Sequence, residues 1–252
     1  MSGRPAWSYV QARLQARHGQ RLGEGEWRAL EAARTLDQFI DRARATALRR
    51  FTEQLNAEQN SHTIERLLRA NWRAYVAETA AWSVTAWQPA ILWTAPLPDL
   101  PAIDAILKGE APRWAAQDPL LAGFLGQDGA AESKQSQLAV LWPGPGREKT
   151  VAARWHAHWC TLLPANGDER RALAALADVV QAHVERLAQA GPRERSASYR
   201  PALAQAVTRL FRRHGGTPVA LFCHLALVAL DLARLRGGLV RRALFEPAKE
   251  AA

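Results

Sequence analysis

A long apolar run near the end of the chain constrains the fold most: "PVALFCHLALVALDLARLRGGLVRR", beginning at Pro218. From Pro218 to Leu230 the run is apolar on every side of a helix, which predicts a buried core helix. It falls short of the ~20 consecutive apolar residues that a membrane-spanning helix needs. We therefore expect a soluble or peripheral protein that folds around this helix.

Helical periodicity dominates the remaining sequence, and strand signals are almost absent. Trp7, Val10 and Leu14 have helical spacing, and Ser61 is the expected N-cap of a long helix. Prolines between residues 89 and 112 predict short helical turns joined by extended links. Other helices are predicted at 24–35, from 37, and at 151–163, 168–190, 200–214 and 218–245. The sequence thus predicts an all-α fold, a compact body of about nine or ten helices, with room for two or three related helical units.

Residues 126–150 are the best candidate for a domain boundary. They combine small polar residues with Pro-Gly-Pro-Gly and carry too little apolar surface to order themselves. We predict an N-terminal helical part at 1–125, a flexible junction at 126–150, and a C-terminal helical part at 151–252 that packs on the first helix.

The chain is basic, with 33 Lys and Arg against 24 Asp and Glu, a net charge of +9 and a pI of about 10.5. Such a balance suits an acidic partner: nucleic acid, anionic lipid or an acidic protein face. The arginines are dispersed, however, so a solvated arginine-rich surface is the preferred interpretation. Tryptophans at 72, 82, 87 and 93 could stack on bases beside these arginines, but their apolar positions favour packing.

The chain opens without a secretory signal pattern, and two cysteines are too few to cross-link a fold of this size. Cys160 and Cys223 are expected to be reduced, inert core thiols. These features predict a cytoplasmic protein, peripheral at the cytoplasmic face of the inner membrane at most.

The segment "RWHAHWC" is the candidate metal site, because His156 and Cys160 lie four residues apart on one helical face. Zinc needs three or four converging ligands, and no other motif supplies the rest. The same segment is better explained as an aromatic packing face of Trp155 and Trp159. No cofactor and no catalytic constellation is predicted.

Asp231 directly follows the apolar run, and a buried acid needs a partner because an unpaired buried charge is costly. Arg234 is a local candidate at i+3. Arg13 and Arg17, four residues apart on the first helix, are distant candidates. We expect one of these arginines to pair with Asp231 and bring the two ends of the chain together.

Four segments resemble, in order, the C-type subunits (d-type in eukaryotes) of the V/A-type ATPases. "WSYVQARLQARHGQRL" is similar to the opening helix of that family, and "LDQFIDRARAT" to the short helix that follows it. "TIERLLRANWRAYV" resembles the next helix, with Glu65 in place. "ALDLARLRGGLVRRALF" resembles the family's D-x-x-N-L-R helix: Asp231, Leu235 and Arg236 match, and Arg234 stands where asparagine is usual.

The resemblance covers roughly residues 7–80 and 219–245. It implies an all-helical, non-catalytic protein, built from three related helical units, that sits on a membrane rotor ring and receives the central stalk. This chain is short enough to lack one unit, and its Trp- and Pro-rich middle has no counterpart. We expect a scaffold or adaptor whose partners are other protein subunits, an ATPase stalk and rotor ring among them. The alternative is a stand-alone basic helical module that binds another protein or nucleic acid.

Overall fold

The computed structural model describes residues 4–125, 137–144, 150–164, 167–189 and 199–245. Within these ranges the chain is all-α: no strand is present, and nine helices have seven or more residues. The predicted fold class is therefore confirmed. Most of the predicted junction at 126–150 falls outside the described ranges, so its flexibility stays a prediction.

The chain divides into two compact units that interleave along the sequence. Unit 1 comprises residues 1–72, 81–85 and 165–252, and unit 2 comprises residues 73–80 and 86–164. These units do not coincide with the two sequential parts predicted above, because residues 1–125 contribute to both.

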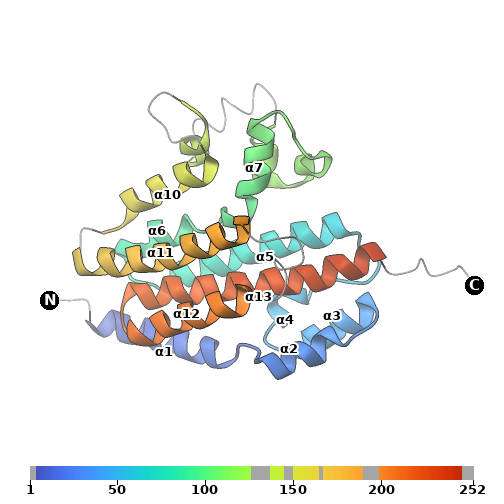
Figure 1. Ribbon diagram of the computed structural model, residues 1–252, viewed down its shortest axis with the longest axis horizontal. Coiled ribbons are helices and arrows are strands. Elements are labelled where there is room, and N and C mark those ends of the chain that lie inside the picture. Colours follow the sequence, from blue (N-terminus) through green and yellow to red (C-terminus); the bar gives the residue numbers. More distant parts are fainter. Residues whose placement is uncertain (1–3, 126–136, 145–149, 165–166, 190–198, 246–252) are drawn as a thin grey trace, which may run out of the picture. The chain divides into compact units, whose positions relative to one another are not determined.

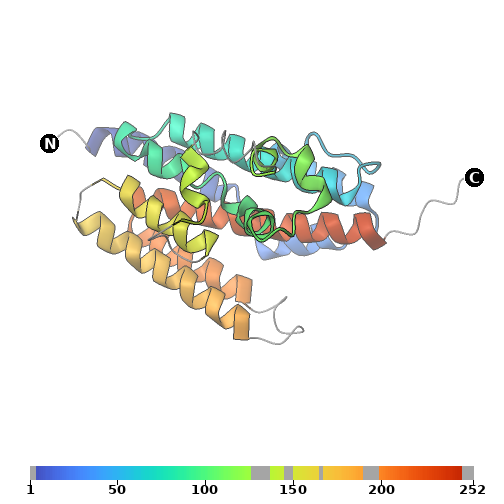
Figure 2. The same ribbon diagram turned by 90° about the horizontal axis from the view of Figure 1, so that it is seen from above.

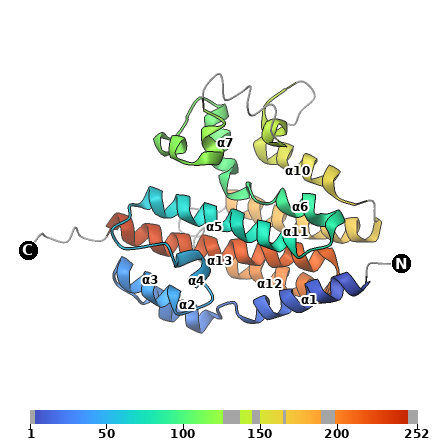
Figure 3. The same ribbon diagram turned by 180° about the vertical axis from the view of Figure 1, so that it is seen from behind.

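Unit 1 is organised around its last helix, α13 (Pro218–Phe245), with the bounds expected from the sequence. The other helices of unit 1 are α1 (Arg4–Gly19), α2 (Glu24–Glu31), α3 (Leu36–Arg44), α4 (Arg49–Thr52), the first part of α5 (Ser61–Ala81), α11 (Gly167–Gln189) and α12 (Tyr199–Arg213). Of these, α1, α3, α11 and α12 pack against α13 (Figure 1). Figure 2 shows α11 and α12 as an antiparallel pair, and Figure 3 shows α1, α2 and α3 along one side of α13.

The core of unit 1 is built from the apolar faces that the periodicity predicts. Leu14 of α1, Phe39 and Ile40 of α3, Phe211 of α12 and Leu235 of α13 are all fully buried. Helix α13 contacts α1 directly.

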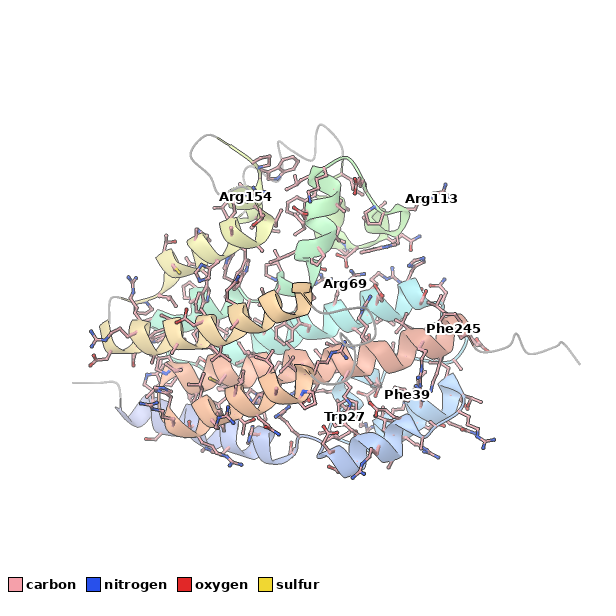
Figure 4. The ribbon with its side chains drawn as sticks, in the orientation of Figure 1. Trp27, Phe39, Arg69, Arg113, Arg154 and Phe245 are labelled. Atoms are coloured by element: carbon pink, nitrogen blue, oxygen red, sulfur yellow. The ribbon has the colours of Figure 1, made fainter. Side chains whose placement is uncertain are left out.

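Helices α3 and α13 approach closely at a glycine. A Cβ added to Gly238 would lie 2.4 Å from Cζ of Phe39, whereas one added to the neighbouring Gly237 would meet nothing within 4 Å. Gly238 therefore makes room for the Phe39 ring, which lies beside α13 in Figure 4.

Two turn details refine the sequence expectations. Helix α5 begins at Ser61, but Asn60 is the capping residue, because its Oδ1 accepts a hydrogen bond from the Thr63 N–H at 2.9 Å. Between α12 and α13, Gly216 has φ +78° and donates its N–H to Oε1 of Gln11 at 2.8 Å. That backbone conformation favours glycine. The hydrogen bond to Gln11 joins the turn before α13 to α1.

Unit 2 consists of short helices, as its prolines predicted, and one longer helix. They are α6 (Gln88–Leu92), η2 (Leu97–Asp99), α7 (Leu100–Leu107), η3 (Arg113–Gln117), α8 (Pro119–Ala122), η4 (Gln137–Leu141) and α10 (Val151–Leu162), after η1 (Thr85–Trp87). Helix α10 packs against α6 and α7. Nε1 of Trp93 donates to the Trp155 carbonyl at 3.0 Å, and Nε1 of Trp155 donates to the Trp93 carbonyl at 2.8 Å.

Candidate functional site: the charged contacts of the last helix

The second half of α13 carries four charged residues that contact the N-terminal helices of unit 1. We call this set the α13 clasp: Asp231, Arg234, Arg236 and Arg242, with the residues they bind. It contains Asp231, Arg236 and Glu65, three of the positions that carry the family resemblance. The clasp is therefore where that resemblance can be compared with the structure.

Asp231 pairs with Arg21, and none of the three arginines expected from the sequence makes this contact. Nε of Arg21 lies 2.7 Å from Oδ2 of Asp231, and Nη2 lies 2.9 Å from Oδ1. Helix α1 ends at Gly19, and the turn that follows it carries Arg21 to α13. The prediction of Arg13, Arg17 or Arg234 as partner was wrong because helical spacing does not describe a residue in a turn.

The Arg21–Asp231 pair is largely buried. The side chains are only 18% and 15% exposed. Burial raises the pKa of Asp231 and outweighs the hydrogen bond and charge of Arg21, which lower it. The pair thus joins two distant segments, but removing both charges from water offsets much of the attraction between them.

Arg234 binds two carboxylates of α2. Its Nε and Nη2 lie 2.6 and 3.0 Å from the two oxygens of Glu31, and its Nη1 lies 2.7 Å from Oε1 of Glu24. The guanidinium also lies 4.7 Å from the centroid of the Trp27 ring. The hydrogen bond from Arg234 lowers the pKa of Glu31 below its ordinary value. Arg234 is therefore a bidentate anchor for α2.

Arg236 pairs with Glu65 of α5. Both residues belong to segments that resemble the ATPase family, and Glu65 also lies 3.8 Å from Arg69 on its own helix. Arg236 is 56% exposed, whereas Glu65 is 17% exposed. This contact links α13 to the first part of α5.

Arg242 is buried and terminates α2. It donates to the carbonyl of Glu31 (2.8 Å), the last residue of α2, and to that of Ala33 (2.6 Å), two residues beyond the helix. Its guanidinium lies 4.2 Å from the centroid of the Phe39 ring. A cation at a helix C-terminus satisfies orphan carbonyls and complements the helix dipole.

Arg13 and Arg17 both lie on the ring of Trp82. Their guanidinium carbons are 5.4 and 5.3 Å from the centroid of the Trp82 ring. Arg13 also donates to the hydroxyl of Tyr9 at 2.7 Å. These distances are typical of cation–π contacts.

His156 and Cys160 lie together on α10, with Nε2 3.8 Å from Sγ. In the described ranges, no group of three or more His, Cys, Asp and Glu residues is placed to hold a metal ion. Trp155 and Trp159 stack with their centroids 6.1 Å apart, and Nε1 of Trp159 donates to the Ala90 carbonyl at 3.2 Å. The segment has the aromatic packing that the spacing of its tryptophans predicts.

The two thiols differ in environment. Cys223 is buried, and burial raises its pKa to about 12, so its thiol is protonated at neutral pH. Cys160 is only partly buried, which corrects the expectation that both thiols belong to the core.

Unit 2 contains a buried network of charged residues that was not predicted from the sequence. Arg73 on α5 lies 2.9 Å from Oδ2 of Asp99 and 3.2 Å from Oδ2 of Asp118, and both carboxylates are 0% exposed. Asp118 also caps α8 by accepting from the Leu120 N–H at 3.0 Å. The Asp-Pro pair at residues 118–119 was a recognisable capping signal, but nothing in the spacing linked it to Arg73.

Two histidines lie beside Phe211 in unit 1: His224 is buried and His18 is partly buried. The ring of His18 on α1 stacks on Phe211 with centroids 4.4 Å apart, and the centroid of His224 on α13 lies 6.5 Å from that of Phe211. Burial, followed by the charges of Arg17, Arg21, His18 and Arg50, lowers the pKa of His224 to about 3. Burial and the charges of Arg21 and Arg212 also lower the pKa of His18.

Two stretches, Thr85–Leu107 and Pro218–Phe245, are long and apolar enough to cross a membrane by length and composition alone. The second is α13, longer than the apolar run at its start, and 67% of its most apolar window is buried by the protein. Core helices also meet these criteria, so the two stretches are weak evidence for a membrane location.

The chain was compared with known proteins in three ways. No family model, no curated protein and no solved structure matches it.

Proposed function

We propose that this chain is a non-catalytic helical scaffold or adaptor, similar to the protein that couples the central stalk of a V/A-type ATPase to its membrane rotor ring. One observation carries the proposal. The segments that resemble the family are far apart in sequence, and they meet in unit 1, where α1 and α3 pack on α13 and Glu65 pairs with Arg236.

The contacts of Arg234 are a second observation in favour of the proposal. Arg234 stands where asparagine is usual, and two acids on α2, Glu24 and Glu31, bind it. These acids lie seven residues apart and so share a helical face. A change at this position together with a matching acid pair is what a diverged relative of the same fold would carry.

In the proposed role the protein sits at the cytoplasmic face of a membrane and binds other protein subunits. Its role would be to hold partner surfaces in register, which requires a body whose distant segments are firmly joined. The α13 clasp supplies such joints in unit 1.

The test is affinity purification from the native host in mild detergent. The full chain would be tagged and expressed at native level, and copurifying proteins quantified by mass spectrometry against a tagged unrelated basic protein. We expect rotor-ring and central-stalk proteins of an ATPase to be enriched at comparable molar amounts. Absence of both from a preparation that contains an intact, folded chain would refute the proposal.

A further inference from the structure

Unit 2 exposes apolar side chains along the stretch from α6 to α7. Residues 79–98 include no Asp, Glu, Lys, Arg or His. Asp99, the first charged residue after them, is buried and bound by Arg73. The stretch Thr85–Leu107 is apolar enough to cross a membrane, yet only 44% of its most apolar window is buried, against 67% for α13. Burial in the core therefore accounts for the apolar run of α13, whereas more than half of this second window is not buried.

The exposed positions of this stretch repeat every three residues. One series is exposed or partly exposed throughout: Ala86, Pro89, Leu92, Ala95, Pro98 and Pro101. The series that begins one residue later is buried throughout: Trp87, Ala90, Trp93, Pro96, Asp99 and Ala102. The stretch thus has one uncharged exposed edge and one buried edge.

The backbone between α6 and α7 explains the period of three. Its N–H groups bond to carbonyls three residues back: Thr94 to Ile91, Ala95 to Leu92, Leu97 to Thr94, and Asp99 to Pro96. Such turns have three residues each, so side chains three positions apart lie above one another. We call the six residues of the exposed series, together with the exposed Leu97 beside them, the apolar strip. Leu92 is 46% exposed and Leu97 is 36% exposed.

The buried series is held by α10. Nε1 of Trp159 donates to the Ala90 carbonyl at 3.2 Å, and Trp93 and Trp155 each donate to the carbonyl of the other. These contacts fix the buried edge of the stretch within unit 2. The apolar strip is therefore exposed by the packing of well-held helices.

The apolar strip is too small for a stable protein interface. Such an interface takes about 20–30 residues on each side, whereas the strip has seven. The strip also lacks charged residues with which to bind an acidic protein or nucleic acid. A lipid surface requires neither a complementary shape nor charge, because each apolar side chain gains free energy by leaving water.

The backbone of the strip also suits contact with lipid. Pro89, Pro98 and Pro101 have no N–H, and the N–H of Ala95 is bonded to the Leu92 carbonyl. These four residues present no N–H that would lose a hydrogen bond to water on entering lipid.

We propose that the apolar strip inserts into the boundary between headgroups and acyl chains of a lipid bilayer. Leu92 and Leu97 provide the largest apolar side chains of this contact. Burial of apolar surface drives the insertion, so it requires neither anionic lipid nor low salt. The proposal goes beyond the scaffold role and holds whether or not an ATPase subunit binds the chain.

Co-sedimentation of the purified full chain with sucrose-loaded phosphatidylcholine vesicles, at low and at high salt, tests the proposal. The strip variant is Leu92→Ser/Leu97→Ser. The matched control is Val180→Ser/Leu244→Ser, which changes two apolar side chains outside the strip that are 37% and 58% exposed. Circular dichroism and melting temperature confirm that each variant is folded.

We expect the partition coefficient of the unmodified chain to differ by less than about twofold between the two salt concentrations. The strip variant should bind about tenfold more weakly or worse, and the control should stay within about twofold of the unmodified chain. Leu92→Trp should bind about threefold more tightly or better, because Trp favours the membrane interface. Misfolding of a variant does not explain a gain that depends on this one position.

Four outcomes would overturn the proposal. One is no sedimentation of the folded chain with phosphatidylcholine vesicles. Another is binding only to vesicles that contain anionic lipid, with loss at high salt, which would assign the contact to the net positive charge. A third is equal weakening by the strip and control variants. The fourth is self-association in analytical ultracentrifugation that the strip variant abolishes and the control retains, which would show that a second copy covers the strip.

Discussion

Arg21 lies two residues beyond the end of α1 and carries the contact that joins the first helix to Asp231. Arg21→Met leaves a buried carboxylate without its partner, and we expect it to lower the free energy of unfolding by about 2 kcal/mol. Arg21→Met/Asp231→Leu should recover at least half of this loss, because it removes both charges together. Urea unfolding of the two single variants and the double variant measures the coupling.

Arg13 provides the control for this cycle. Arg13 contacts Tyr9 and Trp82, so Arg13→Met and Asp231→Leu should be additive within about 0.5 kcal/mol. Coupling of Arg13 to Asp231 as strong as that of Arg21 would contradict the assignment of the pair.

His224 makes stability depend on pH. Its pKa falls from 6.5 to about 3 in the folded chain, so between these values only the unfolded chain binds the proton. The free energy of unfolding should therefore decrease as pH falls through this window, by up to ~1.4 kcal/mol per pH unit. His18, whose pKa is also lowered, acts in the same direction.

Replacing His224 by Gln should remove its part of this dependence. We expect a flatter curve of unfolding free energy against pH between 6.5 and about 3 for His224→Gln, measured by denaturant unfolding at each pH. His156→Gln, at an exposed position, should keep the slope of the unmodified chain. An unchanged slope in His224→Gln would show that other groups set the acid sensitivity.

At the scale of the helix pair, alanine substitutions at two neighbouring glycines of α13 should change the free energy of unfolding in opposite directions. Gly238→Ala places a Cβ against the Phe39 ring and should cost about 1–3 kcal/mol through overpacking. Gly237→Ala meets open space and should stabilise the helix by about 0.5–1 kcal/mol. Thermal unfolding of both variants compares them directly, and a stabilised Gly238→Ala would mean that α3 and α13 are further apart.

The helices were largely predictable because their apolar faces repeat regularly. The bounds of α13 were predicted correctly, and α10, α11 and α12 begin and end within one residue of expectation. The second helix was predicted to run to residue 35 but ends at Glu31, whose carbonyl accepts a hydrogen bond from Arg242. A helix end set by a side chain distant in sequence leaves no local signal.

The candidate site was predictable only in part. Periodicity marked Asp231 as an acid that needs a partner, but the partner lies in a turn, where side-chain direction depends on tertiary structure. Glu24 and Glu31 lie seven residues apart on α2, a spacing that could have been recognised as a face for a cation. The contact of Arg73 with Asp99 and Asp118 depends on turns in a proline-rich segment. No regular spacing in the sequence relates these three residues, so the contact could not be predicted.

At the scale of the whole molecule, α5 contributes to both compact units: its residues up to Trp72 belong to unit 1 and residues 73–80 to unit 2. Arg73 is the first residue of its unit 2 portion and binds two fully buried carboxylates. Arg73→Ala should therefore destabilise the chain by about 3–5 kcal/mol. Hydrogen exchange should show the loss of protection first in α7 and α8, whose starts adjoin these carboxylates.

Lys108 is the control for that prediction. Its pair with Asp104 is exposed, with Lys108 63% and Asp104 35% accessible, so Lys108→Ala should leave the free energy of unfolding nearly unchanged. Similar losses for Arg73→Ala and Lys108→Ala would show that the buried network contributes little to unit 2.

The α13 clasp also sets an order of events during synthesis. Arg21 and Asp231 are separated by 210 positions, and Glu31 precedes Arg234 by 203. At 5–20 residues per second, the ribosome makes Asp231 about 10 to 40 s after Arg21. For that time the first helices have no α13 to bind, and Trp27 and Phe39 lack the helix that covers them. Nascent α1 to α3 should thus be a binding site for chaperones until the last helix emerges.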